Sequence, residues 1–252
     1  MYKSIASTAI ATAFFGQAAA GSEGSSAANP GPFVGETWFS GLIDLDHDDD
    51  IFYWWFESRN SPKDDPLVLW LTGGPGCASE IALFYENGPY QFEADGKTLK
   101  SNPYSWNDKA NLLYVDQPVG TGYSHAGVTH LSTNEEEIAE NMAQFMIKFL
   151  AKFPELQGKD FYITGESYAG HYIPAISHNF MFKHADDLKI NFKGMAIGNG
   201  LVDPYWQYPQ YDVFSYENDL IGKAEYEILG GAFKACQALI ETSVWIVSLE
   251  VC

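Results

Sequence analysis

Ser167 is the residue in this sequence whose surroundings best fit nucleophilic chemistry. An apolar stretch at residues 161–164 runs into the segment GESYAG at residues 165–170, and a helical pattern begins near Tyr168. Glycines on both sides of the serine allow a sharp turn, so its hydroxyl would stand between the end of a strand and the start of a helix. Backbone N–H groups at that helix start suit a developing negative charge. The spacing predicts a serine nucleophile, with an ordinary turn serine as the alternative.

A glycine-rich loop follows an earlier apolar run and could supply further backbone donors. Residues 70–77 read WLTGGPGC, with three glycines around one proline. Without Cβ atoms, the backbone amides of such a loop can approach a reacting group closely. The loop and the serine turn come in the order that an oxyanion site requires. A tight structural turn is the alternative interpretation of this loop.

These two motifs need a sheet to position them, and the rest of the chain predicts one. Short apolar and aromatic runs typical of strands occur at residues 38–46, 51–56, 67–71, 112–115, 161–164 and 195–197. A helix is predicted from Thr133, with Thr133 as N-cap and Glu136 as its capping-box partner, followed by one apolar stripe to Phe153. Strand–helix–strand order indicates an α/β fold with a mainly parallel sheet.

The hydrophobic pattern changes after Pro204. Residues 212–240 are predicted to be helical, with a break at the pair Gly230 and Gly231, and could form a cap outside the sheet. The predicted organisation is a leader at 1–20, a flexible lead-in at 21–35, a core at 36–204 and a helical segment at 205–252.

Five segments together resemble the signature blocks of the serine carboxypeptidases. They are WLTGGPGCAS, FYENGP, NLLYVDQPVGTGYS, GESYAGHYIP and GNGLVDP. This is a family of peptidases that remove C-terminal residues and work best in acid. The resemblance runs from about Trp38 to Pro204 and is closest to plant and protist members. It implies an α/β-hydrolase fold with a mainly parallel central sheet, incomplete at the C-terminus, and the start of a helical cap insertion.

The resemblance also implies roles for individual residues. Ser167 would be the nucleophile, and the backbone N–H groups of Gly74 and Tyr168 would form the oxyanion hole. The carboxylate at the end of a peptide substrate would be held by Trp70, Thr72, Gly73, Glu86 and Glu166. Glu86 and Glu166 would share a proton, because two crowded carboxyls cannot both ionise cheaply. The protonated one could donate to a substrate carboxylate, which would explain a preference for acid.

Thr72 departs from the family pattern. Typical carboxypeptidases carry Asn at this position, and Thr offers one hydroxyl donor and no amide. Thr here also resembles the plant acyltransferases derived from the same family, which transfer an acyl group to an alcohol. Three hypotheses follow: a carboxypeptidase, an acyltransferase, or a truncated product that is catalytically inactive.

The acid–base partners of the serine are not visible in the sequence. Chain order in this fold is Ser, then Asp, then His, and no family motif surrounds His171, His178 or His184. His171 lies four residues after Ser167, but no candidate Asp precedes it in the required order. We therefore expect the Asp and His of the triad to be missing from this chain. No metal-ligand spacing occurs, and neither a metal nor a cofactor is predicted.

Charge and the first residues restrict partners and location. The 252 residues hold 33 acids and 14 bases, a net charge of −19, which argues against nucleic acid as a partner. Lys3, an apolar stretch at 5–15 and the small residues 18–20 resemble a secretory signal peptide, with an uncleaved anchor as the alternative. The expected location is the secretory pathway, extracellular or in a vacuole or lysosome, without stable membrane insertion. The predicted partners are peptides or proteins with a free C-terminus.

The three cysteines, Cys77, Cys236 and Cys252, cannot all pair within one chain. The resemblance implies a distant downstream partner for Cys77. Cys236 and Cys252 could pair with each other or with residues beyond the end. The sequence predicts no oligomeric state.

Overall fold

The chain divides into two compact units between Gly198 and Asn199, and a six-stranded sheet forms the centre of the larger unit. The computed structural model describes residues 32–127 and 130–242. The strands lie in the order β1-β2-β6-β3-β7-β8. Their bounds are β1 Trp38–Asp44, β2 Asp50–Phe56, β3 Leu67–Thr72, β6 Asn111–Val115, β7 Asp160–Glu166 and β8 Asn191–Gly198. The four strands β6, β3, β7 and β8 are parallel, and β1 and β2 add an antiparallel side. The predicted, mainly parallel α/β sheet is confirmed.

Alternate side chains of the central strands fill two separate cores. Tyr53 and Trp55 of β2 belong to the core on one face, while Trp54 and Phe56 belong to the core on the other. Because successive residues of a strand point to opposite faces, a continuous apolar run serves a sheet that is covered on both sides. All six residues of β3 are buried, as this arrangement requires.

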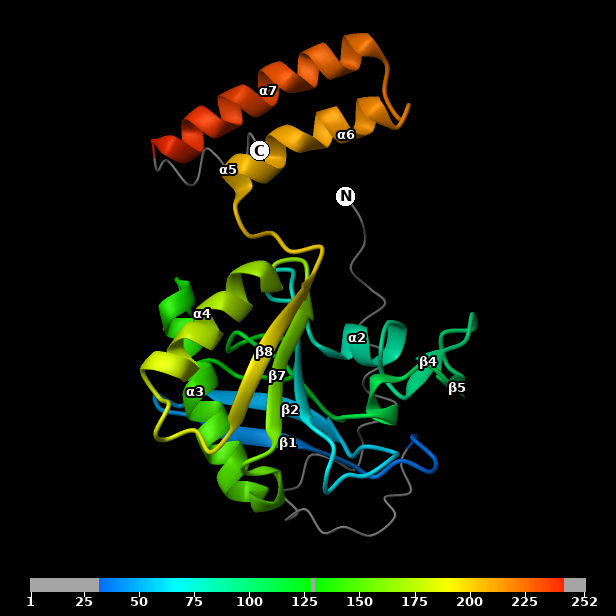
Figure 1. Cartoon of the computed structure of the whole chain (residues 1–252), viewed down its shortest axis with the longest axis vertical. Helices are drawn as coiled ribbons and strands as arrows, with labels where there is room; N and C mark the ends of the chain where they lie inside the picture. Colours follow the sequence, from blue (N-terminus) through cyan, green and yellow to red (C-terminus); the bar gives the residue numbers. More distant parts are fainter. Residues whose placement is uncertain (1–31, 128–129, 243–252) are drawn as a thin grey trace. The chain divides into compact units, whose positions relative to one another are not determined.

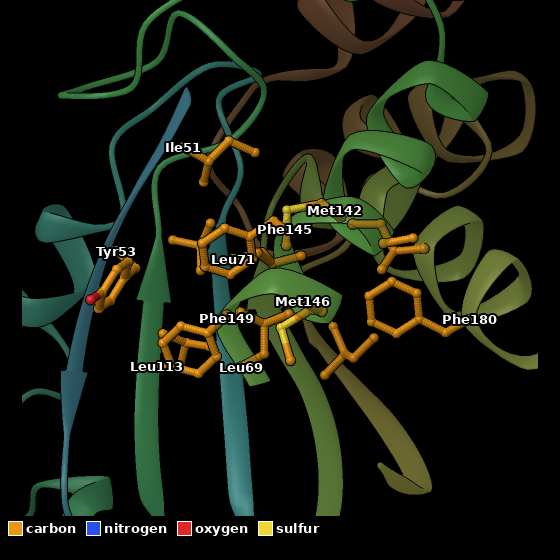
Figure 2. Close-up of a cluster of buried hydrophobic side chains, with 14 of the residues drawn as sticks. Ile51, Tyr53, Leu69, Leu71, Leu113, Met142, Phe145, Met146, Phe149 and Phe180 are labelled. Carbon is orange, nitrogen blue, oxygen red and sulfur yellow. The ribbon is translucent and has the colours of Figure 1, made fainter. Parts of the chain in front are cut away.

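Two helices cover the first face, α3 (Glu135–Lys152) and α4 (Ala169–Phe182), as Figure 1 shows. Figure 2 shows side chains of α3, among them Phe145 and Phe149, directed toward Leu69 and Leu113 of the sheet. The helix begins one residue later than predicted. Asn134 is the N-cap, and its side chain accepts the N–H of Glu137 at 3.0 Å. The prediction of Thr133 as N-cap was wrong because the amide oxygen of Asn134 reaches the orphan N–H first.

The other face carries the short helix α2 (Glu80–Tyr85) and a two-stranded ribbon of β4 (Tyr90–Phe92) and β5 (Leu99–Ser101). Ala82 and Leu83 of α2 pack with Trp54, Val68 and other residues of the second core. Two short 3₁₀ turns, η1 (Trp106–Asp108) and η2 (Pro154–Leu156), lie in connecting segments. The start of α2 follows the glycine-rich loop directly, which ties that loop to the second core.

The smaller unit is helical. It contains α5 (Pro204–Gln207), η3 (Tyr208–Gln210), α6 (Tyr211–Glu217) and α7 (Lys223–Glu241). The predicted break at Gly230 and Gly231 was wrong: α7 runs through both glycines, and the chain breaks between α6 and α7 instead. Gly230 lies against Asp212 of α6, where an added Cβ would come 3.1 Å from the carboxylate oxygen. The predicted leader, most of the lead-in and Cys252 lie outside the described residues.

Candidate active site

Ser167 lies on a sharp turn between β7 and α4. The strand ends at Glu166 and the helix begins at Ala169, so only two residues make the connection. The serine has a φ of +64°, a left-handed conformation that is costly for a residue with a side chain. Two hydrogen bonds hold the turn: the Ser167 N–H donates to the Gly198 carbonyl at 2.9 Å, and the Ser167 carbonyl accepts from the Gly170 N–H at 3.0 Å. The predicted strand-to-helix position of Ser167 is therefore where the structure places it.

The glycine-rich loop lies directly against this turn. A Cβ on Gly73 would come 2.6 Å from the Glu166 carbonyl and 3.0 Å from the Ser167 Cβ, and would also meet the Tyr168 nitrogen. Only a residue without a side chain allows that approach. The next residue, Gly74, has a φ of +112°. Gly74 directly follows Gly73, so its backbone lies next to the close approach of Gly73 and the Tyr168 nitrogen.

The end of β3 brings the carboxylate-binding candidates into register with β7. Thr72 is directly opposite Glu166 in the parallel pair of strands. The Trp70 indole N–H donates to the Thr72 hydroxyl oxygen at 3.2 Å, in a buried position. The Thr72 hydroxyl hydrogen is thereby left available, since that oxygen is used as an acceptor by the indole. Trp70 itself is fixed by an edge-on contact with Trp106, with ring centroids 5.3 Å apart.

Glu86 follows α2 as its C-cap and reaches the same region. Partial burial raises the pKa of the Glu86 carboxyl, and the negative charge of Glu166 raises it further. The two acids therefore interact across the site, and a proton on Glu86 is held more tightly than on a free glutamate. The charge of Glu86 also contributes to the high pKa of the buried Tyr114 hydroxyl, although burial is the larger cause.

All six histidines of the sequence lie among the described residues, and the Ser167 hydroxyl forms no hydrogen bond with any of them there. His171 stacks on Tyr168 with ring centroids 4.6 Å apart. His184 contacts Glu140 at 3.0 Å, and His130 contacts the His47 carbonyl oxygen at 3.0 Å. These contacts join the three rings to partners other than Ser167.

The cysteines have different surroundings. Cys77 is a free thiol at the end of the glycine-rich loop, and its N–H donates to the Gly73 carbonyl at 3.2 Å. Cys236 is buried on α7. Its predicted pairing with Cys252 stays a prediction, because Cys252 is outside the described part of the chain.

One carboxyl pair next to the site was not found from the sequence. Glu80, the first residue of α2, faces Asp116, which follows β6. Asp116 lies within the segment NLLYVDQPVGTGYS, and Glu80 directly follows the segment WLTGGPGCAS, but no local spacing joins the two acids, since 36 positions separate them in the chain. Within the described part of the chain, no group of three or more His, Cys, Asp or Glu side chains could hold a metal ion.

A mainly parallel sheet with a serine on a left-handed turn between a strand and a helix is the arrangement of the α/β-hydrolase fold. The chain has this fold. A solved structure described as Kex1(delta)p, a prohormone-processing carboxypeptidase from Saccharomyces cerevisiae, matches it with a TM-score of 0.72 and 32% sequence identity. The match covers 83% of this chain and 48% of that structure's chain.

The family model described as serine carboxypeptidase matches residues 30–243, and the chain belongs to the serine carboxypeptidase family. "Serine carboxypeptidase S10 family member 1" of Dictyostelium discoideum is 46% identical over 203 residues, which are 80% of this chain and 49% of the relative. "Serine carboxypeptidase-like 49" of Arabidopsis thaliana is 47% identical over 194 residues, 76% of this chain and 37% of the relative. The chain thus spans half or less of the length of these relatives. No helix among residues 32–127 and 130–242 is both long and apolar enough to cross a membrane.

Proposed function

We propose that this chain carries the nucleophile half of a serine carboxypeptidase that releases residues from the C-terminus of peptides. The observation that carries the proposal is the contact between Gly73 and the turn at Ser167 and Tyr168. It puts a side-chain-free backbone beside a strained serine, which is what acyl transfer to a serine needs. Family membership supports the same reaction class.

In the proposed reaction, the Ser167 oxygen attacks the carbonyl carbon of the last peptide bond. Negative charge develops on the carbonyl oxygen, and the backbone N–H groups of Gly74 and Tyr168 stabilise it. The amine leaves after gaining a proton, and water then releases the acyl group from Ser167. Both proton transfers need an acid–base group, and no histidine among the described residues bonds to Ser167. Full activity therefore requires a histidine, with its carboxylate, from outside these residues.

The substrate's terminal carboxylate would bind where β3 and β7 end. Gly73 supplies backbone, Thr72 a hydroxyl supported by Trp70, and the pair Glu86 and Glu166 a shared proton. A protonated Glu86 donates to the carboxylate, whereas an ionised Glu86 repels it. A free C-terminus is then the feature that the site recognises, and recognition is stronger in acid.

An acyltransferase on the same scaffold is the second candidate, favoured by Thr72 in place of Asn. The hydroxyl of Thr72 keeps its hydrogen for a ligand, because Trp70 occupies only its oxygen. An activated ester offered with and without an alcohol separates the two. The peptidase proposal predicts mainly hydrolysis of any acyl group that reaches Ser167, and predominant transfer to the alcohol would contradict it.

The proposed site of action is the secretory pathway, outside the cell or in a vacuole or lysosome, where an acid-dependent clamp would be useful. This rests on the signal-peptide pattern at residues 1–20. The leader hypothesis predicts that the exported protein begins after Ala20, which N-terminal sequencing would test. The pH response of the site fits an acidic compartment, since Glu86 holds its proton more tightly than usual.

A fluorophosphonate probe tests the nucleophile directly. We expect slow labelling of Ser167, because the turn exposes the hydroxyl beside oxyanion donors but no histidine of the described residues bonds to it. Added imidazole should accelerate the labelling severalfold, since it can take the serine proton. Ser167→Ala is the matched control and should remove the label at residue 167 under both conditions. Labelling spread over other serines, or unchanged in Ser167→Ala, would contradict the assignment.

A further inference from the structure

Asp116 is a buried carboxylate that joins two loops beside the proposed site. It is 1% exposed. Its Oδ1 accepts the backbone N–H of Ser79 at 2.8 Å, and its Oδ2 accepts the backbone N–H of Tyr123 at 2.9 Å. Gly122 leaves room for it: a Cβ there would come 2.6 Å from the Asp116 Cγ. The carboxyl therefore connects the start of α2 to the turn at residues 121–124.

Glu80 approaches the same carboxyl. Its Oε2 is fully buried and accepts no hydrogen bond from any N–H or O–H donor in the part of the chain that the structure describes. The side chain of Glu80 as a whole is hydrogen-bonded to the side chain of Asp116. Two carboxyls can hydrogen bond only if one of them carries a proton, so this pair holds one proton and one negative charge.

The electrostatic surroundings keep that proton in place. Burial raises the pKa of Glu80 to about 9, with a further contribution from the charge of Asp116. Burial also raises the pKa of Asp116, against the hydrogen bonds that it accepts. Among the residues that the structure describes, the phenol of Tyr123 also faces the pair, and its pKa is raised by burial and by both acids. No cation of the described residues contributes to the raised pKa of Glu80 or of Asp116.

Hydrogen bonds through Ser79 connect this pair to the end of β3. The Ser79 hydroxyl donates to the Val115 carbonyl at 2.7 Å and accepts the Thr72 N–H at 3.3 Å. On the other side, the Ser124 hydroxyl donates to the Asp116 carbonyl at 2.6 Å. Ser79 thus links the end of β3 at Thr72 to Val115 of β6 and to Asp116. These bonds fix the segment 72–80, which contains the glycine-rich loop and the start of α2.

We propose that Glu80 is a positioning residue that, when protonated, donates to Asp116 and so holds the segment 72–80 in the conformation that the site at Ser167 requires. This role rests on the proposed function, because the segment 72–80 contains the proposed oxyanion loop and Thr72, a proposed carboxylate-binding residue. Loss of the proton at higher pH puts two buried negative charges together and releases the segment. This device is separate from the pair Glu86 and Glu166, which would contact the substrate itself.

Hydrogen exchange of the full chain tests the proposal, with protection factors used so that the intrinsic pH dependence of exchange is removed. In the unaltered chain, protection of residues 73–80 and 117–124 should fall at least tenfold from pH 5 to pH 9. Glu80→Gln places a permanent amide donor on Asp116 and should keep the pH 5 protection, with less than a threefold change over that range. Glu80→Ala should lower protection at every pH.

Glu93→Gln is the matched control, since Glu93 is a glutamate of the same unit outside this carboxyl pair, and it should behave as the unaltered chain. A full pH dependence in Glu80→Gln would overturn the proposal, as would normal protection at pH 5 in Glu80→Ala. If Glu80→Ala does not fold, Glu80→Gln decides alone. Ser167→Ala and Glu86→Gln should leave the loop protection unchanged, so failure of the proposed chemistry and failure of the positioning role give different results.

Discussion

At Ser167, a backbone conformation that suits glycine carries a side chain instead. A φ of +64° costs an ordinary residue about 1–2 kcal/mol, and the turn keeps it through bonds to Gly198 and Gly170. A glycine would relieve the strain but would remove the hydroxyl. A serine in a strained conformation that glycine would adopt without cost indicates that the hydroxyl has a function.

Replacing Ser167 tests this strain without any assay of activity. Ser167→Gly should be more stable than Ser167→Ala by about 1 kcal/mol, because only glycine adopts positive φ without cost. The measurement is urea unfolding of both variants. Equal stability, or a more stable alanine variant, would argue against a strained turn.

The contact at Gly73 predicts a second stability effect. Gly73→Ala would force a Cβ to within 2.6 Å of the Glu166 carbonyl, so the loop or the turn at Ser167 must move. We expect a loss of about 2 kcal/mol or more in the free energy of unfolding. Gly194→Ala is the control within the same unit, since nothing lies within 4 Å of the position that its Cβ would occupy. A Gly73→Ala variant as stable as the control would contradict the close approach of loop and turn.

Local motifs made most of the residue-scale site predictable. Ser167 and the glycine-rich loop are recognisable because each lies within ten residues of the strand that positions it. Glu80 and Asp116 were not predicted, because they meet only after β6 is inserted between β2 and β3. Neither residue has a neighbour in the sequence that indicates the other.

At the scale of elements, α3 is the helix whose start differs from the sequence prediction. Thr133 and Asn134 both favour an N-cap position. The side chain of Asn134 takes the Glu137 N–H, and the Thr133 N–H is taken by the Glu137 carboxylate at 2.7 Å. The cap is therefore shifted by one residue, and Glu137 accepts the N–H of the residue before the N-cap instead of that of the N-cap itself. Two adjacent capping residues cannot be ranked from sequence alone.

Alanine substitutions distinguish the two possible caps. Asn134→Ala should lower the free energy of unfolding by about 1 kcal/mol, the usual cost of losing an N-cap. Thr133→Ala should cost less, because the Thr133 backbone N–H still reaches Glu137. Thermal or urea unfolding provides the measurement. A larger loss for Thr133→Ala would favour Thr133 as the cap after all.

The strands could be predicted more fully than the helices that follow Pro204. Runs such as those of β3 and β6 are mostly apolar and buried throughout, because both faces of the sheet are covered. In α7, by contrast, two adjacent glycines suggest a break, although the helix continues and one of them lies against Asp212. Packing between α6 and α7 therefore decides what the local propensity alone does not.

For the whole molecule, the net negative charge and the buried carboxyls both make the fold less stable as pH rises. The net charge of −19 becomes more repulsive as pH rises. Burial raises the pKa of Glu80 to about 9, so the folded chain holds a proton between about pH 4.5 and 9 that the unfolded chain releases. Stability from this group is complete below the unfolded pKa and is lost as pH rises through that window.

Groups of the opposite kind set the acid limit. Asp95 accepts hydrogen bonds from Thr98 and Lys97, and the pKa of its carboxyl falls to about 2. Its contribution is lost as pH falls toward that value. We therefore expect the melting temperature to be highest near pH 5 and to fall by several degrees at pH 8. Added salt should recover part of the loss at pH 8, because it screens the surface repulsion. A melting temperature that rises from pH 5 to pH 8 would contradict this balance.

The sequence did not predict that the division into two compact units falls after Gly198, and the chain matches only about half the length of its relatives. The sheet, the turn and the loop are complete enough to be recognised in 252 residues. No histidine of the described residues is hydrogen-bonded to Ser167, and the absence of the triad Asp and His stays a prediction. Recognition of the substrate terminus does not need that base, so it can be tested on this chain alone.

The most direct test of the account is the affinity of this chain for a peptide with a free C-terminus, measured by calorimetry from pH 5 to pH 8 beside the same peptide amidated. Because the pKa of Glu86 is raised by burial and by Glu166, its proton is present in acid and is lost as pH rises. We predict about a tenfold or greater loss of affinity for the free peptide, which corresponds to about 1.4 kcal/mol, and less than a twofold change for the amide. Glu86→Gln keeps a donor at every pH and should flatten the profile. Equal pH profiles for the free and amidated peptides would contradict the central claim that this site binds a substrate carboxylate.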